Sequence, residues 1–220
     1  MAVRSEHALF VGEFLRDPVK TASVVPSSAV LAARMVAALP ERGDPVVVEL
    51  GPGTGAFTAA IQERLAGRGR HVAVELNDRM TAHLRGRFPR VEVVTGGADE
   101  LPGIVADRGI AAADLIVSGL PWTVYFGGER ALASTIASVL SPQGAFTQFT
   151  YAWTSWTPPA RRQRAQLRAA FEEVVLSRTV WRNVPPAFVY VARRPRVHGP
   201  TGPAGPESAE RAPAALPAVR

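Results

Sequence analysis

The sequence predicts a doubly wound α/β fold built around a mostly parallel sheet of seven strands. Three valines at 46–48 form an apolar, β-branched run of the kind found in buried parallel strands. The run passes through Glu49 into a glycine-rich turn, and residues 56–65 then have the apolar spacing of a helix. This strand–turn–helix order recurs along the chain, which is typical of a sheet with helices on both faces. The expected strands lie near residues 45–50, 71–75, 91–95, 114–118 and 144–151, followed by a hairpin-like pair near 173–181 and 187–193.

The two ends of the chain differ in composition from this core. Apolar residues within 9–15, with arginines at 4 and 16, predict a short amphipathic helix that ends before Pro18. A second helix is expected to begin at the serines at 27–28, one of which would be its N-cap, and to end near Leu39. We therefore expect N-terminal helices over residues 1–40, a core domain over 41–195, and a disordered Pro-, Gly- and Ala-rich tail over 196–220.

Residues 131–160 contain no charged side chain, as a membrane span would. Pro142, Gln143 and Gly144 interrupt this stretch, and Ser and Thr recur in it, so it predicts a helix, a turn and a buried strand. The N-terminus has no basic region followed by an apolar block and a cleavage site. We therefore expect a cytoplasmic protein that does not cross a membrane.

The charge balance points to an anionic partner. The chain has 25 Lys and Arg against 19 Asp and Glu, a formal net charge of +6. Such a surface attracts either nucleic acid or anionic lipid headgroups. The chain has no cysteine, which excludes disulfides, Cys-ligated zinc and a thiol nucleophile. Its four histidines are scattered without metal-like spacing, so no metal site is expected.

The glycine-rich turn after the first strand predicts a nucleotide-type cofactor site. Glycines at 51, 53 and 55 let the backbone turn sharply and approach a ligand closely, at the start of the following helix. With Ala56 the spacing also satisfies a loose dinucleotide-binding pattern. Glu49 favours a cationic ligand instead of a pyrophosphate. S-adenosylmethionine carries a sulfonium and an ammonium, and this strand–acid–glycine order resembles motif I of class I methyltransferases.

Two further acids follow the next two expected strands. Glu75 ends the second strand, about 20 residues after Gly55, where a carboxylate can accept both ribose hydroxyls of an adenosine. Asp99 follows the third strand, where its carboxylate can accept the adenine amino group while the neighbouring backbone N–H at Ala98 meets a ring nitrogen. Acids after three successive strands favour S-adenosylmethionine over NAD. The predicted cofactor-binding residues are Glu49, Gly51, Gly53, Gly55, Glu75, Ala98, Asp99 and Ser118.

The fourth expected strand runs into Ser118, Gly119, Leu120, Pro121 and Trp122. This segment resembles motif IV of methyltransferases that modify nitrogen, in which a small polar residue, a proline and an aromatic face the methyl group. Backbone carbonyls and the polar side chain would orient the N–H bonds of an amine, so that its lone pair points at the methyl carbon.

Two families share this arrangement, the rRNA adenine dimethylases and the bacterial phospholipid N-methyltransferases. The second is the closer match and spans about residues 10–194. It rests on residues 14–18 with Thr21 and 26–28, on residues 118–121, on residues 148–151, and above all on residues 181–190. The chain is therefore similar to enzymes that methylate phosphatidylethanolamine stepwise to phosphatidylcholine. An rRNA dimethylase would continue into a helical C-terminal domain, whereas here the fold is expected to finish near Arg194.

The resemblance implies an enzyme that uses S-adenosylmethionine at an anionic membrane surface, bound peripherally from the cytoplasm. It implies catalytic roles for Ser118, Leu120, Pro121, Trp122 and Tyr151, and substrate-binding roles for Tyr125 and Arg182, the latter on the lipid phosphate. Tyr151, Tyr125 or a water would take the proton of the amine. The alternatives are an RNA adenine N6-methyltransferase, a methyltransferase of small amines, and a catalytically silent protein that binds membrane.

Overall fold

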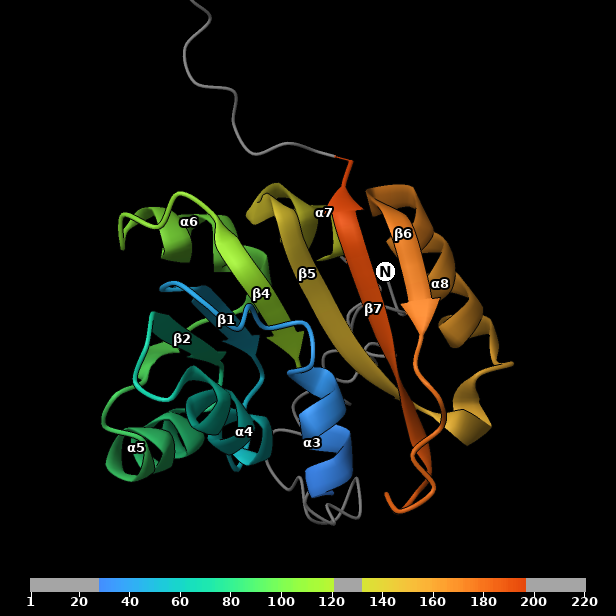
Figure 1. The fold of residues 1–220 in the computed structure, drawn as a ribbon, viewed down its shortest axis with the longest axis horizontal. Helices are drawn as coiled ribbons and strands as arrows, with labels where there is room; N and C mark the ends of the chain where they lie inside the picture. Colours follow the sequence, from blue (N-terminus) through green and yellow to red (C-terminus); the bar gives the residue numbers. More distant parts are fainter. Residues whose placement is uncertain (1–27, 121–131, 197–220) are drawn as a thin grey trace, which may run out of the picture.

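The computed structural model (Figure 1) describes residues 28–120 and 132–196, which form an α/β fold around one sheet. The seven strands follow the order β3-β2-β1-β4-β5-β7-β6. The pairs from β3 to β5 are parallel, and β7 runs antiparallel to both β5 and β6. This confirms the predicted mostly parallel sheet with a hairpin-like end. The strands are β1 (Val46–Leu50), β2 (Arg70–Glu75), β3 (Glu92–Thr95), β4 (Ala113–Ser118), β5 (Leu140–Tyr151), β6 (Phe171–Leu176) and β7 (Ala187–Pro195).

Helices cover both faces of the sheet. Successive strand residues point to opposite faces, so each strand places apolar side chains against both layers of helices. On one face, Val47 packs with α3 (Ala29–Met35) and α4 (Ala56–Leu65). On the other face, Val48 and Leu50 belong to a core that includes α6 (Leu101–Ala106), α7 (Leu132–Ser138) and α8 (Pro158–Ala170). A third, smaller cluster packs α5 (Asp78–Arg87) against β2 and β3. Two short 3₁₀ helices complete the described fold, η1 (Ala98–Glu100) and η2 (Ala152–Thr154).

The fifth strand is longer than the sequence predicted, because the turn expected at residues 142–144 is a bulge within it. β5 begins at Leu140, and its register with β4 shifts between the pairs Ala113–Leu140 and Leu115–Ala145. The extra residues loop out of the ladder there. A Cβ at Gly144 would lie 2.9 Å from the Ala113 carbonyl oxygen, which explains the glycine. The described part of the uncharged stretch therefore contains α7, one bulged strand, η2 and the first residues of α8.

Other boundaries also shift. The helix that starts after Ser28 ends at Met35, not near Leu39, and Ser28 Oγ caps it by accepting the Leu31 N–H at 3.2 Å. β6 covers Phe171–Leu176 instead of 173–181, and residues 177–186 connect it to β7. The first amphipathic helix expected within residues 1–27, and the tail expected over 196–220 apart from Arg196, lie outside the described residues. In the described ranges, no helix has the length and hydropathy needed to span a bilayer.

Candidate functional site

The carboxyl ends of β1 to β5 meet at one edge of the sheet, and the loops that leave them are hydrogen-bonded to one another's strands. The Gly51 N–H donates to the Val74 carbonyl at 2.9 Å, and the Gly119 N–H donates to the Leu50 carbonyl at 2.8 Å. The Gly96 N–H donates to the Glu75 carbonyl at 3.1 Å. These bonds join the loops after β1, β3 and β4 into one edge whose geometry is fixed before any ligand arrives.

Glu49 is fully buried near the end of β1, and only one of its two carboxylate oxygens accepts a hydrogen bond from the described residues. Its Oε2 accepts the hydroxyl of Thr58 on α4 at 2.7 Å. His71 Nε2 lies 3.2 Å from the same oxygen, at ion-pair distance but without the alignment of a hydrogen bond. His71 Nδ1 in turn contacts Gln62 Nε2 at 3.0 Å. Glu49 Oε1 has no hydrogen-bond partner among the described residues. A buried carboxylate oxygen without a hydrogen-bond donor would be stabilised by a cationic ligand.

Glu75 is also buried and connects two loops. Its Oε2 accepts the Gly53 N–H at 3.1 Å, and its Oε1 accepts the Asn77 N–H at 3.0 Å. Each oxygen keeps a second lone pair for a ligand hydroxyl. Leu76, directly after it, is exposed at this edge, where an apolar side chain can cover the face of a base. Sequence reasoning missed Leu76, although an apolar residue after a strand-end acid was a usable signal.

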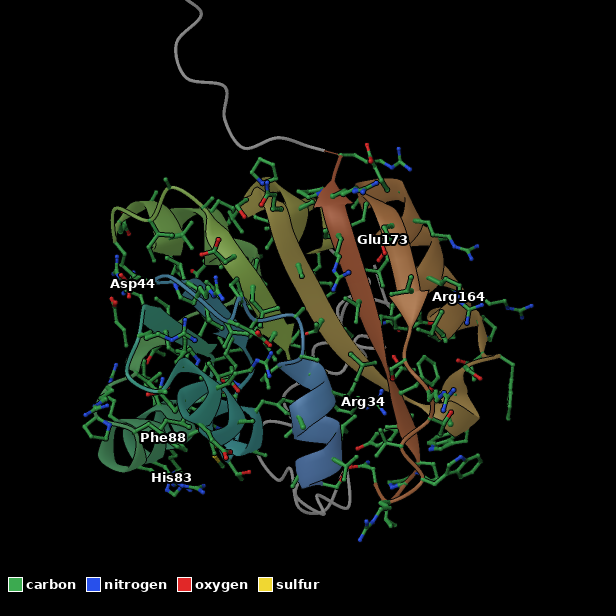
Figure 2. The ribbon with its side chains drawn as sticks, viewed as in Figure 1. Arg34, Asp44, His83, Phe88, Arg164 and Glu173 are labelled. Carbon is green, nitrogen blue, oxygen red and sulfur yellow. The ribbon has the colours of Figure 1, made fainter. Side chains whose placement is uncertain are left out.

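The turn between β1 and α4 has the backbone that its glycines permit. Gly51, Gly53 and Gly55 have φ of +65°, +54° and +87°, in the left-handed region. A Cβ at Gly55 would strike the ring of Phe88, which Figure 2 labels at the end of α5, whereas a Cβ at Gly53 would meet nothing within 4 Å. No side chain caps the N-terminus of α4. The turn thus leaves open space at Gly53, and the uncapped start of α4 leaves backbone N–H groups for a close-bound ligand.

The third acid lies on η1, the short helix that follows β3. Asp99 is exposed and Ala98 is buried in the core. The Glu100 carboxylate accepts the Gly97 N–H at 2.8 Å and fixes this turn. The structure therefore brings Glu49, Glu75 and Asp99 to the same sheet edge, as their positions after three parallel strands predicted.

The loop after β4 is held by a residue that the sequence reasoning did not assign to the site. Gln148 of β5 is buried and pairs in register with Ser118, which is also buried. Its Nε2 donates to the Leu120 carbonyl at 3.1 Å and to the Phe149 carbonyl at 2.8 Å. The Leu120 N–H donates to Ser118 Oγ at 3.3 Å. Gln148 Oε1 has no hydrogen-bond partner within the described ranges. The sequence signals for this role were an amide side chain near the end of an expected buried strand and the resemblance over residues 148–151.

The remaining predicted residues do not all join this group. Tyr151 lies three residues beyond Gln148, roughly 10 Å along the strand, and on the opposite face of the sheet. Its ring packs edge-on against Phe149 with centroids 5.5 Å apart, and burial raises its pKa above the ordinary value of 10.0. Arg182 is exposed in the β6–β7 connection. Pro121, Trp122 and Tyr125 lie outside the described residues.

Among the described residues, no group of three His, Asp or Glu side chains could hold a metal ion. The groups that are present fit S-adenosylmethionine. The buried Glu49 Oε1 needs a cationic partner, the open space at Gly53 leaves room for a ligand against the backbone, and Glu75 can accept hydroxyls.

Comparison with known proteins bears on the same region. A family model described as a methyltransferase domain matches residues 47–144. Ornithine lipid N-methyltransferase from Singulisphaera acidiphila is 34% identical over 189 residues, a match that covers 84% of this chain and 94% of that protein.

Solved structures share the fold at low sequence identity. The O-methyltransferase from Bacillus cereus in complex with SAH has a TM-score of 0.59 at 16% identity, covering 84% of this chain and 90% of that chain. A putative rRNA-methylase from Clostridium thermocellum has a TM-score of 0.57 at 15% identity, covering 80% of this chain and all of that chain. Identities this low establish the architecture alone.

Proposed function

Because the chain belongs to the class I S-adenosylmethionine-dependent methyltransferases, we propose that it methylates the amine of a phosphatidylethanolamine-type membrane lipid. The enzyme class and the cofactor follow from the family and from the fold. The acceptor is the proposal. One observation carries it: a relative 34% identical, matched over 94% of its length, is an ornithine lipid N-methyltransferase. Ornithine lipid and phosphatidylethanolamine both present an amine on a headgroup anchored by acyl chains.

We assign the donor side of the reaction to the acid-and-glycine edge. When bound there, S-adenosylmethionine would supply an activated methyl group: the bond from the amine nitrogen to the methyl carbon forms as the carbon–sulfur bond breaks, and S-adenosylhomocysteine leaves. Glu49 would neutralise the ammonium of the ligand, and Glu75 would accept its ribose hydroxyls. Asp99 and the backbone at Ala98 would bind the adenine, which Leu76 would cover. These residues bind and orient the donor, and the fixed loops exclude water from it.

We assign the acceptor side to the loop after β4. The Leu120 carbonyl accepts one bond from Gln148 and keeps a second lone pair, and Gln148 Oε1 is a buried acceptor beside it. Together with Ser118 Oγ they can receive the N–H bonds of an amine and leave its lone pair free for the methyl carbon. We also assign Pro121 and Trp122 to the acceptor, Trp122 through cation–π attraction to the methylated ammonium.

An amine attacks only in its neutral form, so the proton must leave first. Burial raises the pKa of Tyr151, so its hydroxyl stays protonated at neutral pH and is a poor base. A tyrosine with the ordinary pKa of about 10 is protonated at neutral pH as well, so we assign proton removal to water and not to Tyr125. Tyr151 and Arg182 remain candidates for contacts to the headgroup, Arg182 through a forked bond to phosphate.

The proposed enzyme works at the membrane surface as a peripheral protein. Its net charge of +6 favours an anionic bilayer. The same charge would suit RNA, which makes an adenine in rRNA the second acceptor to test.

The test presents purified protein with S-adenosylmethionine labelled in the methyl group. Parallel reactions contain vesicles with phosphatidylethanolamine, vesicles with ornithine lipid, or unmodified rRNA. We expect label in the phosphatidylethanolamine product, identified by mass spectrometry, and none in RNA. Glu75→Gln is the matched inactive control, since it should bind the donor poorly.

Three other outcomes would change the proposed acceptor or contradict it. Label in ornithine lipid alone would move the substrate to the chemistry of the relative, and label in RNA would replace the lipid by adenine. Donor binding without transfer to any of the three would contradict a lipid acceptor.

A further inference from the structure

Four large apolar side chains remain exposed at one end of the sheet. Trp153, Trp156, Trp181 and Val184 have exposed fractions between 58% and 76%. We call these four residues the tryptophan face. Folded proteins bury most of their tryptophan surface, so three exposed indoles in two neighbouring segments indicate an interaction surface.

Hydrogen bonds bring the two segments together. Trp153 lies on η2 and Trp156 just beyond it, whereas Trp181 and Val184 lie in the β6–β7 connection. The Ala152 N–H donates to the Pro186 carbonyl at 2.8 Å, and Tyr151 pairs with Ala187. Figure 1 shows η2, between β5 and α8, beside the long connection that leads into β7.

The connection that carries Trp181 and Val184 is anchored in the fold. Asn183, between them, is buried; its Oδ1 accepts the Ser28 N–H at 2.9 Å, and its Nδ2 donates to the Pro185 carbonyl at 2.7 Å. Val180 also pairs with Ala187. Trp181 and Val184 therefore point outward from a fixed backbone, and their exposure does not come from a loose loop.

The tryptophan face borders the acceptor side of the site. Ser118 pairs with Gln148, and the strand that holds Gln148 ends three residues later at Tyr151, directly before η2. The distance from Gln148 to the end of β5 is roughly 10 Å. Whatever contacts the tryptophan face is thus next to the place where the methyl acceptor must enter.

The two segments that carry the tryptophan face, together with α8, have charge of one sign. Residues 151–170 and 177–186 contain six arginines and no acidic residue. Arg164 is engaged, since its Nε donates to the Tyr190 hydroxyl at 3.3 Å; Figure 2 labels it on α8. Arg161, Arg162, Arg178 and Arg182 are exposed. Exposed indoles among arginines match an anionic lipid–water interface, where the ring enters the headgroup region and the guanidinium meets phosphate.

We propose that the tryptophan face docks the enzyme on an anionic lipid surface, with the carboxyl edge of the sheet turned toward the headgroups. The inference deepens the proposed function, on which it rests for the choice of lipid as the partner. A second copy of this chain suits the face less well, because a two-fold contact would bring like-charged arginines together.

The experiment measures binding to vesicles without cofactor or turnover. Full-length protein is sedimented with phosphatidylglycerol vesicles and with phosphatidylcholine vesicles, some of them carrying brominated acyl chains that quench nearby indoles. The test variant combines Trp153→Ser, Trp156→Ser and Trp181→Ser. Arg178→Glu tests the charge, and Arg42→Glu, an exposed arginine before β1 at the opposite edge of the sheet, is its matched control. Circular dichroism and S-adenosylmethionine calorimetry confirm that each variant is folded.

We expect binding to phosphatidylglycerol that weakens with salt, together with quenching of the native protein by brominated lipid. The triple variant should bind roughly tenfold or more weakly and lose most of the quenching. Arg178→Glu should weaken binding by about fivefold or more, and Arg42→Glu by less than twofold.

Three results would overturn the inference. They are native protein that does not bind the vesicles, a folded triple variant that binds them as tightly as the native protein, and tryptophan substitutions that change self-association or RNA binding instead. Vesicle binding needs no methyl transfer, so the proposed acceptor and the docking surface fail independently of each other.

Discussion

Glu75 performs two tasks with one carboxylate. It accepts backbone N–H groups from the turn after β1 and from the start of α5, so it holds the site together before a ligand binds. Each oxygen keeps a second lone pair that can accept a ligand hydroxyl. The residue thus couples the shape of the site to its binding chemistry, and a change there should affect both.

We expect Glu75→Gln to weaken S-adenosylmethionine binding by about 10- to 100-fold, because a neutral amide loses bonds worth about 1.5–3 kcal/mol to charged groups. Isothermal titration calorimetry measures this loss. Glu63→Gln, on the exposed side of α4, makes the same chemical change outside the site and should leave affinity unchanged. Equal affinity for the native protein and Glu75→Gln would remove Glu75 from the cofactor site.

Gln148 is a positioning residue, because it fixes the Leu120 carbonyl through its amide nitrogen. Gln148→Leu should lower kcat by roughly 100-fold while leaving the affinity for S-adenosylmethionine within about threefold. Gln163→Leu removes another buried glutamine amide, one on α8 in contact with Thr150, and should cost stability without this loss of kcat. Steady-state kinetics and calorimetry separate the two. Equal losses of kcat in both variants would reduce Gln148 to a structural role.

Tyr151 offers a test by pH. Its pKa is raised by burial, so the neutral phenol is favoured in the folded state. The stability that this provides is present below pH 10 and is lost as the pH rises through the folded pKa. Native protein should therefore lose more stability than Tyr151→Phe between pH 8 and pH 11, as urea denaturation measures. The pH–rate profile of Tyr151→Phe should match that of the native enzyme between pH 6 and pH 9. If Tyr151→Phe lost a rise in rate with pH that the native enzyme shows, Tyr151 would be the base after all.

At the scale of elements, the proposed site consists of the loops after β1 and β4. These two loops contact each other at Gly51 and Gly119. A Cβ at Gly119 would lie 2.5 Å from the Gly51 carbonyl oxygen, and a Cβ at Gly51 would strike Leu120. The loop after β4 therefore packs directly on the loop after β1. This contact sets the distance between the donor and acceptor sides, which neither loop could set alone.

Gly119→Ala should lower the free energy of unfolding by about 1–3 kcal/mol, because a backbone carbonyl cannot move aside as a flexible side chain can. It should also lower kcat more than it lowers cofactor affinity. Gly103→Ala is the control, because Gly103 lies inside α6 with open space around it. The free energy of unfolding of this variant should be unchanged or raised by up to about 1 kcal/mol. Chemical denaturation compares the two. A Gly119→Ala variant as stable and active as Gly103→Ala would contradict close packing of the loops.

At the scale of the whole molecule, the proposed cofactor edge joins every strand from β1 to β4 and the helices between them. A ligand that binds only this assembled edge must stabilise the folded state by mass action. At a concentration 100 times its Kd, S-adenosylmethionine should add about 2.7 kcal/mol, which corresponds to a rise in Tm of roughly 5–10 °C. Differential scanning fluorimetry measures the shift, with adenine alone as the weak-binding comparison. A Tm that does not respond to the ligand would contradict the site.

Much of this fold was readable from local patterns. The β-branched run at 46–48, the glycine turn and the repeated strand–helix order predicted the sheet, since these signals depend only on neighbouring residues. The acids at 49, 75 and 99 were predicted to meet because the carboxyl ends of parallel strands share an edge. Boundaries were less accurate. The bulge in β5 reads as a turn in the sequence, and only its pairing with β4 keeps it within one strand.

The sequence by itself determined the fold class, the mostly parallel sheet and the positions of the acids near the carboxyl ends of the strands, because periodicity and turn chemistry are local properties. Only the tertiary structure decided which side chains share a partner. It placed His71 and Thr58 on one oxygen of Glu49, put Gln148 against the acceptor loop, and moved Tyr151 to the other face of the sheet. It also gathered three tryptophans from two distant segments. Contacts of this kind depend on strand register and on packing between layers, which are fixed only when the whole sheet has formed.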